Sequence, residues 1–214
     1  LVNSVFDKVY KNYDLMNDLM SFGVHRLWKK NLITWMNPQI GNKIIDVASG
    51  TGDLAKIISE KNDNQNIVNC VEPNKGMLKT GKQKLKSFKN IKWHLSSAEK
   101  LLFKDNYFDF YTISYGIRNV TDINSCLREA YRVLKPGGRF LCLEFSKVEN
   151  EILKLLYQQY SKLIPMFGKI IVGSSEPYEY LTTSIEKFYN QNDLSDLLKN
   201  NNFSNVQFRN LSNG

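Results

Sequence analysis

Histidine and cysteine are scarce in this chain, and long apolar runs are missing. Of 214 residues, 2 are His and 3 are Cys, which leaves few ligands for a zinc centre or a disulfide framework. The cysteines form no C-x-x-C pair, so we expect a reducing compartment and no metal site. No apolar stretch approaches the roughly 20 residues that cross a bilayer, and the start has no signal-peptide pattern.

Acidic residues are outnumbered, with 21 Asp and Glu against 29 Lys and Arg, so the net charge is +8. This balance is compatible with nucleic acid, an anionic membrane surface or an anionic substrate. A non-enzymatic module that binds nucleic acid or membrane therefore stays open at this point. Lysine runs such as 82–86 are also typical of an ordinary solvated helix face. With 42% hydrophobic and 23% charged residues, the composition is otherwise that of one globular domain.

Short apolar runs alternate with amphipathic stretches, which is the pattern of β-α-β units. The pattern predicts helices at 53–61, 74–87 and 122–134, and strands at 43–48, 67–72, 91–95, 107–113 and 139–145. Such units need right-handed crossovers and a sheet covered on both faces. The predicted fold is α/β, an open, doubly wound, mostly parallel sheet. Ligands bind such sheets at the carboxyl ends of the strands, near a topological switch point.

The regions outside this pattern are predicted to be mostly helical parts of the same single domain. We expect N-terminal helices at 1–40, a cofactor-binding core at 41–146, a helical substrate cap at 147–190, and a C-terminal helix and strand at 191–214. That last strand is predicted at 205–211. The chain begins with Leu1 and ends in Asn213-Gly214, a dipeptide typical of a hairpin turn. We therefore expect upstream residues and a final antiparallel strand to be missing.

A glycine loop follows the first predicted strand, in the run Asp46-Val47-Ala48-Ser49-Gly50-Thr51-Gly52-Asp53. Gly50 and Gly52 allow a tight turn and a close backbone approach, and the helix start behind them stabilises an anionic group. Glu72 follows Gly52 by 20 residues and ends the second predicted strand, where an acid commonly accepts hydrogen bonds from ribose hydroxyls. The arrangement predicts a nucleotide cofactor.

Two cofactor classes fit this loop. The run Gly50-Thr51-Gly52-Asp53-Leu54-Ala55 satisfies G-x-G-x-x-A, so an NAD-type oxidoreductase is an alternative. A carboxylate at Asp53, however, would repel the pyrophosphate of a dinucleotide. S-adenosylmethionine carries a positive amino group and a positive sulfonium, so it tolerates Asp46, Asp53 and Glu72 far better. The charges therefore favour S-adenosylmethionine.

The fourth predicted strand ends in Ser114-Tyr115-Gly116-Ile117. Nucleic-acid amino-methyltransferases carry an Asn/Asp-Pro-Pro-aromatic motif at this point. The mismatch speaks against an enzyme that methylates bases, and we predict no nucleic-acid partner.

Two long segments resemble the signatures of one enzyme family. Tyr13–Trp28 (YDLMNDLMSFGVHRLW) is similar to the N-terminal signature of the ubiquinone/menaquinone-biosynthesis C-methyltransferases, and Arg132–Ser146 (RVLKPGGRFLCLEFS) to their second signature. Gly116–Asp122 resembles the family's substrate-side loop, and Tyr178–Ile185 its cap motif. The resemblance covers essentially the whole chain. It implies a Rossmann-like class I methyltransferase that moves the methyl group of S-adenosylmethionine to a ring carbon of a polyprenylated benzoquinol or naphthoquinol.

The predicted cofactor-binding residues come from the glycine loop and from the family's cofactor positions. They are Asp46, Gly50, Thr51, Gly52, Glu72, Ser97, Ala98 and Ser114. The resemblance implies Glu72 on the ribose, Ser97 and Ala98 beside the adenine, and Ser114 at the amino-acid end. Three positions depart from the family pattern, because Glu72 replaces the usual Asp, Ser97 a common Asn and Ser49 a common third Gly.

Methylation of a quinol ring needs an electron-rich carbon, which loss of a phenolic proton provides. A free phenol loses that proton only near pH 10. Arg118 is the main predicted catalytic residue; it stays protonated, so it would stabilise the phenolate and orient a water that takes the proton. Asn119 is predicted to hydrogen-bond a ring oxygen and Tyr178 to close over the ring. His25 is a further candidate base, although a lone His among helices is more often structural.

The predicted partners follow from a substrate with a lipid tail. We expect a polyprenylated quinol, peripheral association with an anionic membrane surface, and, from the family, a homodimer or a ubiquinone-biosynthesis complex. The location would be the matrix face of the mitochondrial inner membrane in a eukaryote or the cytoplasmic face of the membrane in a bacterium. The broad apolar segment 152–172 is predicted to pack as a cap helix, or to line a polyprenyl tunnel or touch the bilayer.

Overall fold

The computed structural model describes residues 18, 21, 23–147 and 176–212. The chain divides into two compact units, one formed by Leu27–Glu144 and the other by Leu1–Arg26 with Phe145–Gly214. The unit Leu27–Glu144, here called the core unit, contains nearly all of the predicted cofactor-binding region. The predicted apolar segment 152–172 lies outside the described residues, and so do residues 1–17, 19, 20 and 22 of the predicted N-terminal helices.

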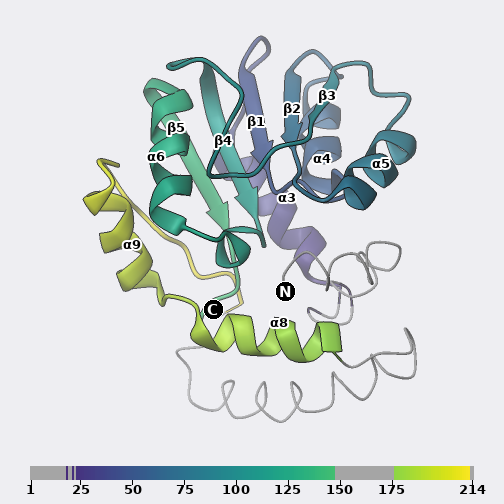
Figure 1. The fold of residues 1–214 in the computed structure, drawn as a ribbon. Helices are drawn as coiled ribbons and strands as arrows, with labels where there is room; N and C mark the ends of the chain where they lie inside the picture. Colours follow the sequence, from purple (N-terminus) through teal and green to yellow (C-terminus); the bar gives the residue numbers. More distant parts are fainter. Residues whose placement is uncertain (1–17, 19–20, 22, 148–175, 213–214) are drawn as a thin grey trace. The chain divides into compact units, whose positions relative to one another are not determined.

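A five-stranded sheet forms the centre of the core unit (Figure 1). Its strands are β1 (Lys43–Val47), β2 (Ile67–Val71), β3 (Ile91–His94), β4 (Phe108–Ser114) and β5 (Leu134–Leu143). All neighbouring pairs are parallel, in the order β3-β2-β1-β4-β5. The predicted α/β fold is confirmed. Because the chain winds outward from β1 to β3 and then returns to β4, the switch point lies between β1 and β4.

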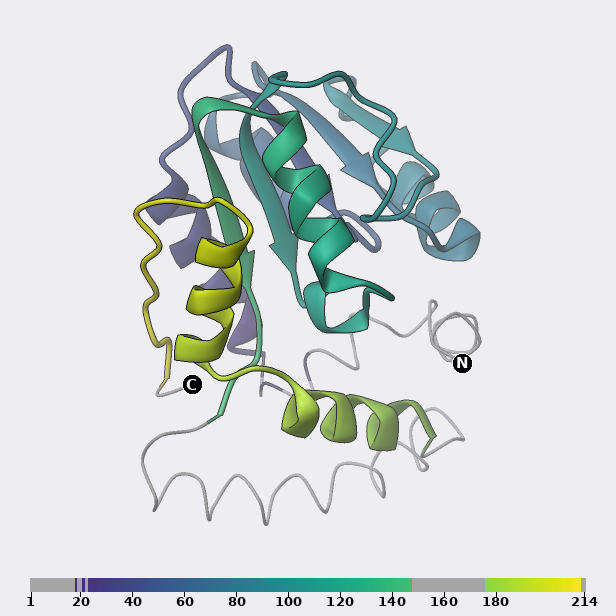
Figure 2. The ribbon, with the colours of Figure 1, turned by 60° about the vertical axis from the view of Figure 1, so that its left-hand side comes forward.

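Helices cover both faces of this sheet (Figures 1 and 2). The core unit holds most of α3 (His25–Met36), together with α4 (Asp53–Lys61), α5 (Lys75–Lys84), the 3₁₀ turn η1 (Ile117–Asn119) and α6 (Ile123–Val133). Helix α6 lies against one face beside β4 and β5, and α3 and α4 lie on the other. The side chains of Asn74 and Asp122 cap α5 and α6 by accepting from Met77 N and Asn124 N, which defines both starts.

The central strand is buried on both sides, as its mostly apolar sequence predicts. Ile44, Ile45 and Val47 of β1 are fully shielded from solvent. The turn into α4 packs equally closely, because a Cβ placed on Gly52 would lie 2.8 Å from both Leu85 and Trp93. This glycine also has a φ of +86°, so its lack of a side chain fixes the path of the glycine loop against the core.

Two predicted strands differ from the structure. Strand β5 begins at Leu134, five residues before the predicted 139, and its pairing with β4 is irregular between Phe108 and Phe110. As the last strand in the sheet order, β5 tolerates Pro136 within it. The predicted strand at 205–211 is wrong, because these residues form no regular element. Val206 and Phe208 alternate with polar residues as in a strand, but Phe208 is 49% exposed and the segment pairs with no strand among the described residues.

The described part of the second unit contains α8 (Glu176–Lys187) and α9 (Gln191–Asn200). Asn190 caps the start of α9, and its side chain accepts from Asp193 N. Leu181, Ile185 and Phe188 are buried. Among the described residues, no helix has both the length and the apolar character needed to cross a membrane.

Candidate functional site

The loops that follow β1 and β4 lie in contact at the switch point. A Cβ on Gly116 would lie 2.5 Å from the Cβ of Ala48, so only glycine permits this approach. Ala48 and Tyr115 both adopt a positive φ, of 52° and 57°, which is costly for residues with a side chain. Such strained conformations persist where the surrounding structure imposes them, and they concentrate at functional sites.

Glu72 joins the end of β2 to the glycine loop. Its Oε2 accepts from Gly50 N at 2.8 Å and its Oε1 accepts from Asn74 N at 2.9 Å. Only 4% of the residue is exposed. Burial raises the pKa of Glu72, and the two backbone hydrogen bonds oppose that rise. Each carboxylate oxygen can accept more than one hydrogen bond, so Glu72 is oriented by the backbone and can still receive ribose hydroxyls.

Asp46 is the most deeply buried acid of the site, with 1% of its surface exposed. Its Oδ1 accepts from Thr112 Oγ1 at 2.8 Å, across the β1–β4 pair. Its Oδ2 is buried and has no hydrogen-bond partner among the described residues. Burial raises the pKa of Asp46 to about 7, against the lowering effects of Thr112 and Lys29. An incompletely bonded carboxylate of this kind is complementary to a cationic group.

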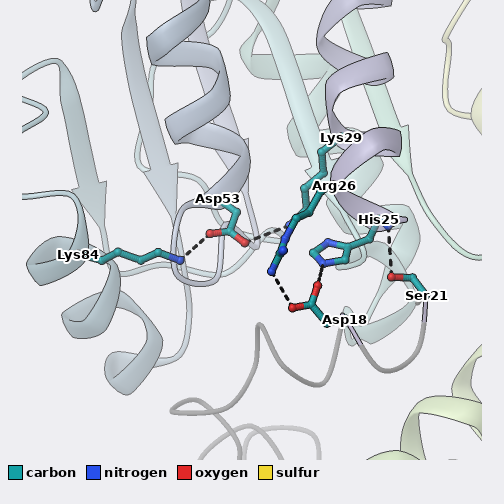
Figure 3. A network of polar contacts seen from close by, with 7 residues as sticks. All are labelled: Asp18, Ser21, His25, Arg26, Lys29, Asp53 and Lys84. Carbon is teal, nitrogen blue, oxygen red and sulfur yellow. Dashed lines mark hydrogen bonds and ion pairs between the residues drawn. The ribbon is translucent and has the colours of Figure 1, made fainter. Parts of the chain in front are cut away.

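Asp53, at the start of α4, is held by two lysines (Figure 3). Its Oδ1 lies 2.7 Å from Lys84 Nζ, and its Oδ2 lies 3.4 Å from Lys29 Nζ. Burial would raise the pKa of Asp53, but the two ammonium groups outweigh it and hold that pKa below its usual value. The negative charge of Asp53, which in the sequence argues against a dinucleotide, is therefore neutralised by two lysines of the core unit.

Arg118 lies in η1 and pairs with Glu144, which follows β5 directly. The side chains are only 3% and 4% exposed, so this is a buried ion pair rather than a surface one. Its neighbour Asn119 donates from Nδ2 to Tyr115 O at 3.3 Å. Both predicted residues therefore belong to the segment that leaves β4 at the carboxyl edge of the sheet.

The remaining predicted cofactor residues also follow strand ends. Ala98 and Thr51 are buried, and Ser97 is half-buried in the loop after β3. Ser114 is the last residue of β4, and its buried Oγ has no hydrogen-bond partner within the described part of the chain. The core unit thus brings the predicted cofactor residues to one edge of the sheet.

Two further candidates belong to the second unit. Tyr178 lies in α8. His25 is fully buried, and its Nε2 lies 2.9 Å from Asp18 Oδ1 (Figure 3). Asp18 also binds Arg26 at 2.6 Å, and the backbone N of His25 donates to Ser21 Oγ. A histidine held this way within its own local segment is the arrangement typical of a structural residue.

A cationic nucleoside fits this set of residues. At the switch point, Asp46 Oδ2 can accept a hydrogen bond and Ser114 Oγ can accept or donate one, and neither atom has a partner among the described residues. Glu72 is oriented for ribose hydroxyls, and the loop glycines have the backbone conformation that a close approach requires. The Ser114 hydroxyl and the deeply buried Asp46 carboxylate suit a cation, such as the amino or sulfonium group of S-adenosylmethionine, better than a pyrophosphate.

Sequence reasoning missed Lys29 and Glu144. Glu144 immediately follows a strand, as Glu72 does, so its position at a strand end was a usable signal. Lys29 had no such signal, because a lysine on a helix next to another lysine is usually solvated. Only the packing of α3 shows that one of the two, Lys29, is buried while Lys30 is exposed.

Several solved structures of similar fold are named as methyltransferases. A chain from the complex of the Haloferax volcanii Trm112 methyltransferase activator with a putative methyltransferase has a TM-score of 0.68 at 15% identity, covering 92% of this chain and 75% of that one. A structure from Thermotoga maritima titled as an S-adenosylmethionine-dependent methyltransferase has a TM-score of 0.64 at 19% identity, covering 94% and 80%. At these identities the likeness establishes the fold.

Sequence relatives are far more similar. Proteins named ubiquinone/menaquinone biosynthesis C-methyltransferase UbiE are 49% identical in Rickettsia prowazekii and 50% identical in Rickettsia felis. Each alignment covers 100% of this chain and 89% of the relative. The family model for ubiE/COQ5 methyltransferases matches residues 1–214. The glycine loop, the oriented acid after β2 and this match over the full chain together show that the chain belongs to the ubiE/COQ5 methyltransferase family.

Proposed function

We propose that this chain moves the methyl group of S-adenosylmethionine to a ring carbon of a polyprenylated quinol, in ubiquinone or menaquinone biosynthesis. The main support is the family match over residues 1–214, together with relatives that are about 50% identical to this chain over its whole length. Family membership confirms the predictions of a methyltransferase and of S-adenosylmethionine as its cofactor. The alternative of an NAD-type oxidoreductase is not supported.

The residues that would hold the cofactor are the eight predicted from the sequence. Glu72 would receive the ribose hydroxyls, and the loop after β3, with Ser97 and Ala98, would contact the adenine. Asp46 and Ser114 would face the amino-acid end; in support, a side-chain oxygen of each is buried with no partner in the described part of the chain. When bound, S-adenosylmethionine supplies a methyl carbon that is electrophilic because its sulfur is cationic.

The protein's part in the chemistry is to raise the electron density of the ring. We assign Arg118 to the phenolic oxygen of the substrate, where its charge would favour the ionised form and orient a water that takes the proton. The buried pair with Glu144 supports this role, because it fixes the guanidinium in one orientation. Asn119 is proposed to bind a ring oxygen, and Tyr178 to close over the ring. These residues would hold the electron-rich ring carbon beside the methyl donor, and the proton that the methylated carbon loses as the ring regains aromaticity would pass to water.

A lipid-tailed substrate supports peripheral membrane association. Between Glu72 and Glu99 the chain carries no acid and seven exposed lysines, Lys75, Lys79, Lys82, Lys84, Lys86, Lys89 and Lys92. Such a surface is attracted to anionic headgroups. The compared relatives are bacterial, which supports the cytoplasmic face of the membrane rather than the mitochondrial matrix face. The family also supports a homodimer or a larger biosynthetic complex. A single species of 24.8 kDa in sedimentation would contradict this assembly.

One assay tests the reaction and its setting. Demethyl benzoquinol and naphthoquinol analogues with short prenyl tails are presented in vesicles, with labelled S-adenosylmethionine as the methyl source. We expect label in the ring, and faster transfer on vesicles with anionic lipid than on neutral ones. An absence of ring methylation with both quinols would contradict the function. Equal rates on both vesicle types would contradict the membrane proposal alone.

The affinity for the cofactor product, S-adenosylhomocysteine, should rise with pH. The pKa of Asp46 in the free protein is about 7, and a cationic amino group binds its carboxylate form. Because the folded pKa lies above the ordinary value, the neutral form dominates below pH 7 and weakens binding there. We expect about tenfold weaker binding at pH 6 than at pH 8 by calorimetry.

Replacing Asp46 tests whether its carboxyl group causes the pH dependence of S-adenosylhomocysteine binding. The variant Asp46→Asn should bind more weakly at pH 8 and with little pH dependence. Exposed Asp63 provides the matched control, and Asp63→Asn should keep the wild-type slope. A wild-type slope in Asp46→Asn would assign the titration to another group, such as Glu72.

A further inference from the structure

A buried lysine of α3 lies at the switch point. Lys29 belongs to α3 and is 6% exposed. Its Nζ lies 3.4 Å from Asp53 Oδ2 (Figure 3). The same atom lies 5.9 Å from the centroid of the Tyr115 ring. Asp53 begins α4 after the glycine loop, whereas Tyr115 follows β4. The ammonium group therefore lies between the two loops that form the cofactor edge of the core unit.

This ammonium group is incompletely bonded. A lysine offers three N–H donors, but among the described residues its only hydrogen-bond partner is Asp53, at the long distance of 3.4 Å. Asp53 is itself bound more closely by Lys84, at 2.7 Å. Two ammonium groups thus share one carboxylate. A buried charge without full compensation is costly, so the site has capacity for another anionic group.

A second incomplete group of opposite sign lies nearby. The Oδ2 of Asp46 is buried without a partner among the described residues. Lys29 is close enough to lower the pKa of Asp46. The edge between β1 and β4 therefore presents one cation and one anion that each have hydrogen-bonding capacity unused by the described residues. An α-amino acid carries the complementary pair, a carboxylate and an ammonium group.

We propose that Lys29 binds the carboxylate of the cofactor's amino-acid part, while Asp46 faces its ammonium group. The inference rests on the proposed function, since it assigns one more residue to the cofactor of that reaction. Lys29 repels the ammonium and the sulfonium, so it also determines which end of the amino acid approaches α3. Asp53 then acts as a positioning residue that holds Lys29 at the loop.

The competing interpretation is that Lys29 only completes an ion pair with Asp53. In that case removal of the Lys29 ammonium group would lower the affinity for every ligand of the site by the same factor. The proposal requires instead that the effect depend on the ligand's carboxylate. Two ligands separate these outcomes: S-adenosylhomocysteine, and its decarboxylated counterpart, which retains the adenosine, the thioether and the amine.

The experiment measures both ligands by calorimetry on the full chain. We expect the wild type to bind S-adenosylhomocysteine roughly 10 to 100 times more tightly than the decarboxylated ligand. In Lys29→Met this preference should fall to about threefold or less, while affinity for the decarboxylated ligand changes little. Lys30→Met, at the exposed neighbour on the same helix, should keep the wild-type preference. Lys29→Arg should keep most of it, because it retains the charge.

Each contrary result has its own meaning. A wild type that shows no preference, or a Lys29→Met variant that keeps the full preference, overturns the inference and leaves the proposed function standing. A wild type that binds neither ligand overturns the proposed function. If Lys29→Met fails to fold, the neutral Lys29→Gln variant takes its place, and the wild-type preference must still be present.

Discussion

Replacing Arg118 by Ala should lower the rate of methyl transfer by about a thousandfold, while S-adenosylhomocysteine binds within about threefold of the wild type. Removal of one preorganised group that stabilises developing negative charge typically lowers a rate 100- to 1000-fold. Arg118 lies in η1, beyond the end of β4, and not in the glycine loop. Single-turnover transfer of labelled methyl to a quinol analogue measures the rate, and calorimetry measures binding.

The buried pair makes a second variant necessary. Arg118→Ala leaves the Glu144 carboxylate buried without its cation, which destabilises a protein by about 3–5 kcal/mol. The double variant Arg118→Gln with Glu144→Gln removes both charges and keeps hydrogen-bonding side chains. We expect it to unfold near the wild-type temperature and to remain inactive, which separates catalysis from folding.

The matched control is Arg128, an exposed arginine on α6 whose side chain is 63% exposed. Arg128→Ala should leave both turnover and stability close to the wild type. Arg118→Lys retains the charge but not the planar fork of donors, so intermediate activity is expected. A folded variant that lacks Arg118 and turns over at the wild-type rate would remove this residue from the mechanism.

Replacing Glu72 by Gln should weaken the binding of S-adenosylhomocysteine by at least about a hundredfold. The two carboxylate oxygens accept from Gly50 N and Asn74 N. A glutamine has one acceptor oxygen, so its NH₂ would face one of these donors and leave a buried N–H without a partner. The variant also loses the negative charge that strengthens hydrogen bonds from the ribose hydroxyls. Calorimetry measures the affinity, and thermal unfolding reports whether the loop has loosened.

Two variants show whether the effect is specific. Glu72→Asp keeps two acceptor oxygens and is shorter by one methylene, so its affinity should stay within about tenfold of the wild type. Glu60→Gln changes an acid on α4 whose side chain is 53% exposed and should have no effect. If Glu72→Gln binds S-adenosylhomocysteine with wild-type affinity, Glu72 does not bind the ribose hydroxyls.

Much of the core unit could be predicted because its signals are local. Helix α4 has the predicted bounds Asp53–Lys61, since a glycine loop precedes it and a polar turn follows. Strands β1 to β4 end within one residue of the predicted positions, because apolar runs of strand length stop at polar or glycine residues. The eight predicted cofactor residues lie at the loop and strand ends for the same reason.

The wrong strand predictions lie where the local sequence pattern favours one structure and the tertiary contacts impose another. Pro136-Gly137-Gly138 reads as a helix stop followed by a turn, but β5 already pairs with β4 at Leu134. An edge strand can accommodate such a sequence, which no local rule predicts. At 205–211 the few apolar residues suggested a strand that the structure does not form.

The sequence by itself determined the fold class, the glycine loop and the acid after β2, because alternation, turn residues and strand ends are encoded in neighbouring positions. Only the tertiary structure decided which charges meet. Arg118 and Glu144 are 26 residues apart, and Lys29 and Asp53 are 24 apart. The folding of α3 against the core unit buries Lys29, whereas the next residue, Lys30, stays exposed. Burial and partner choice depend on contacts between distant segments, and a linear pattern of residue types does not contain them.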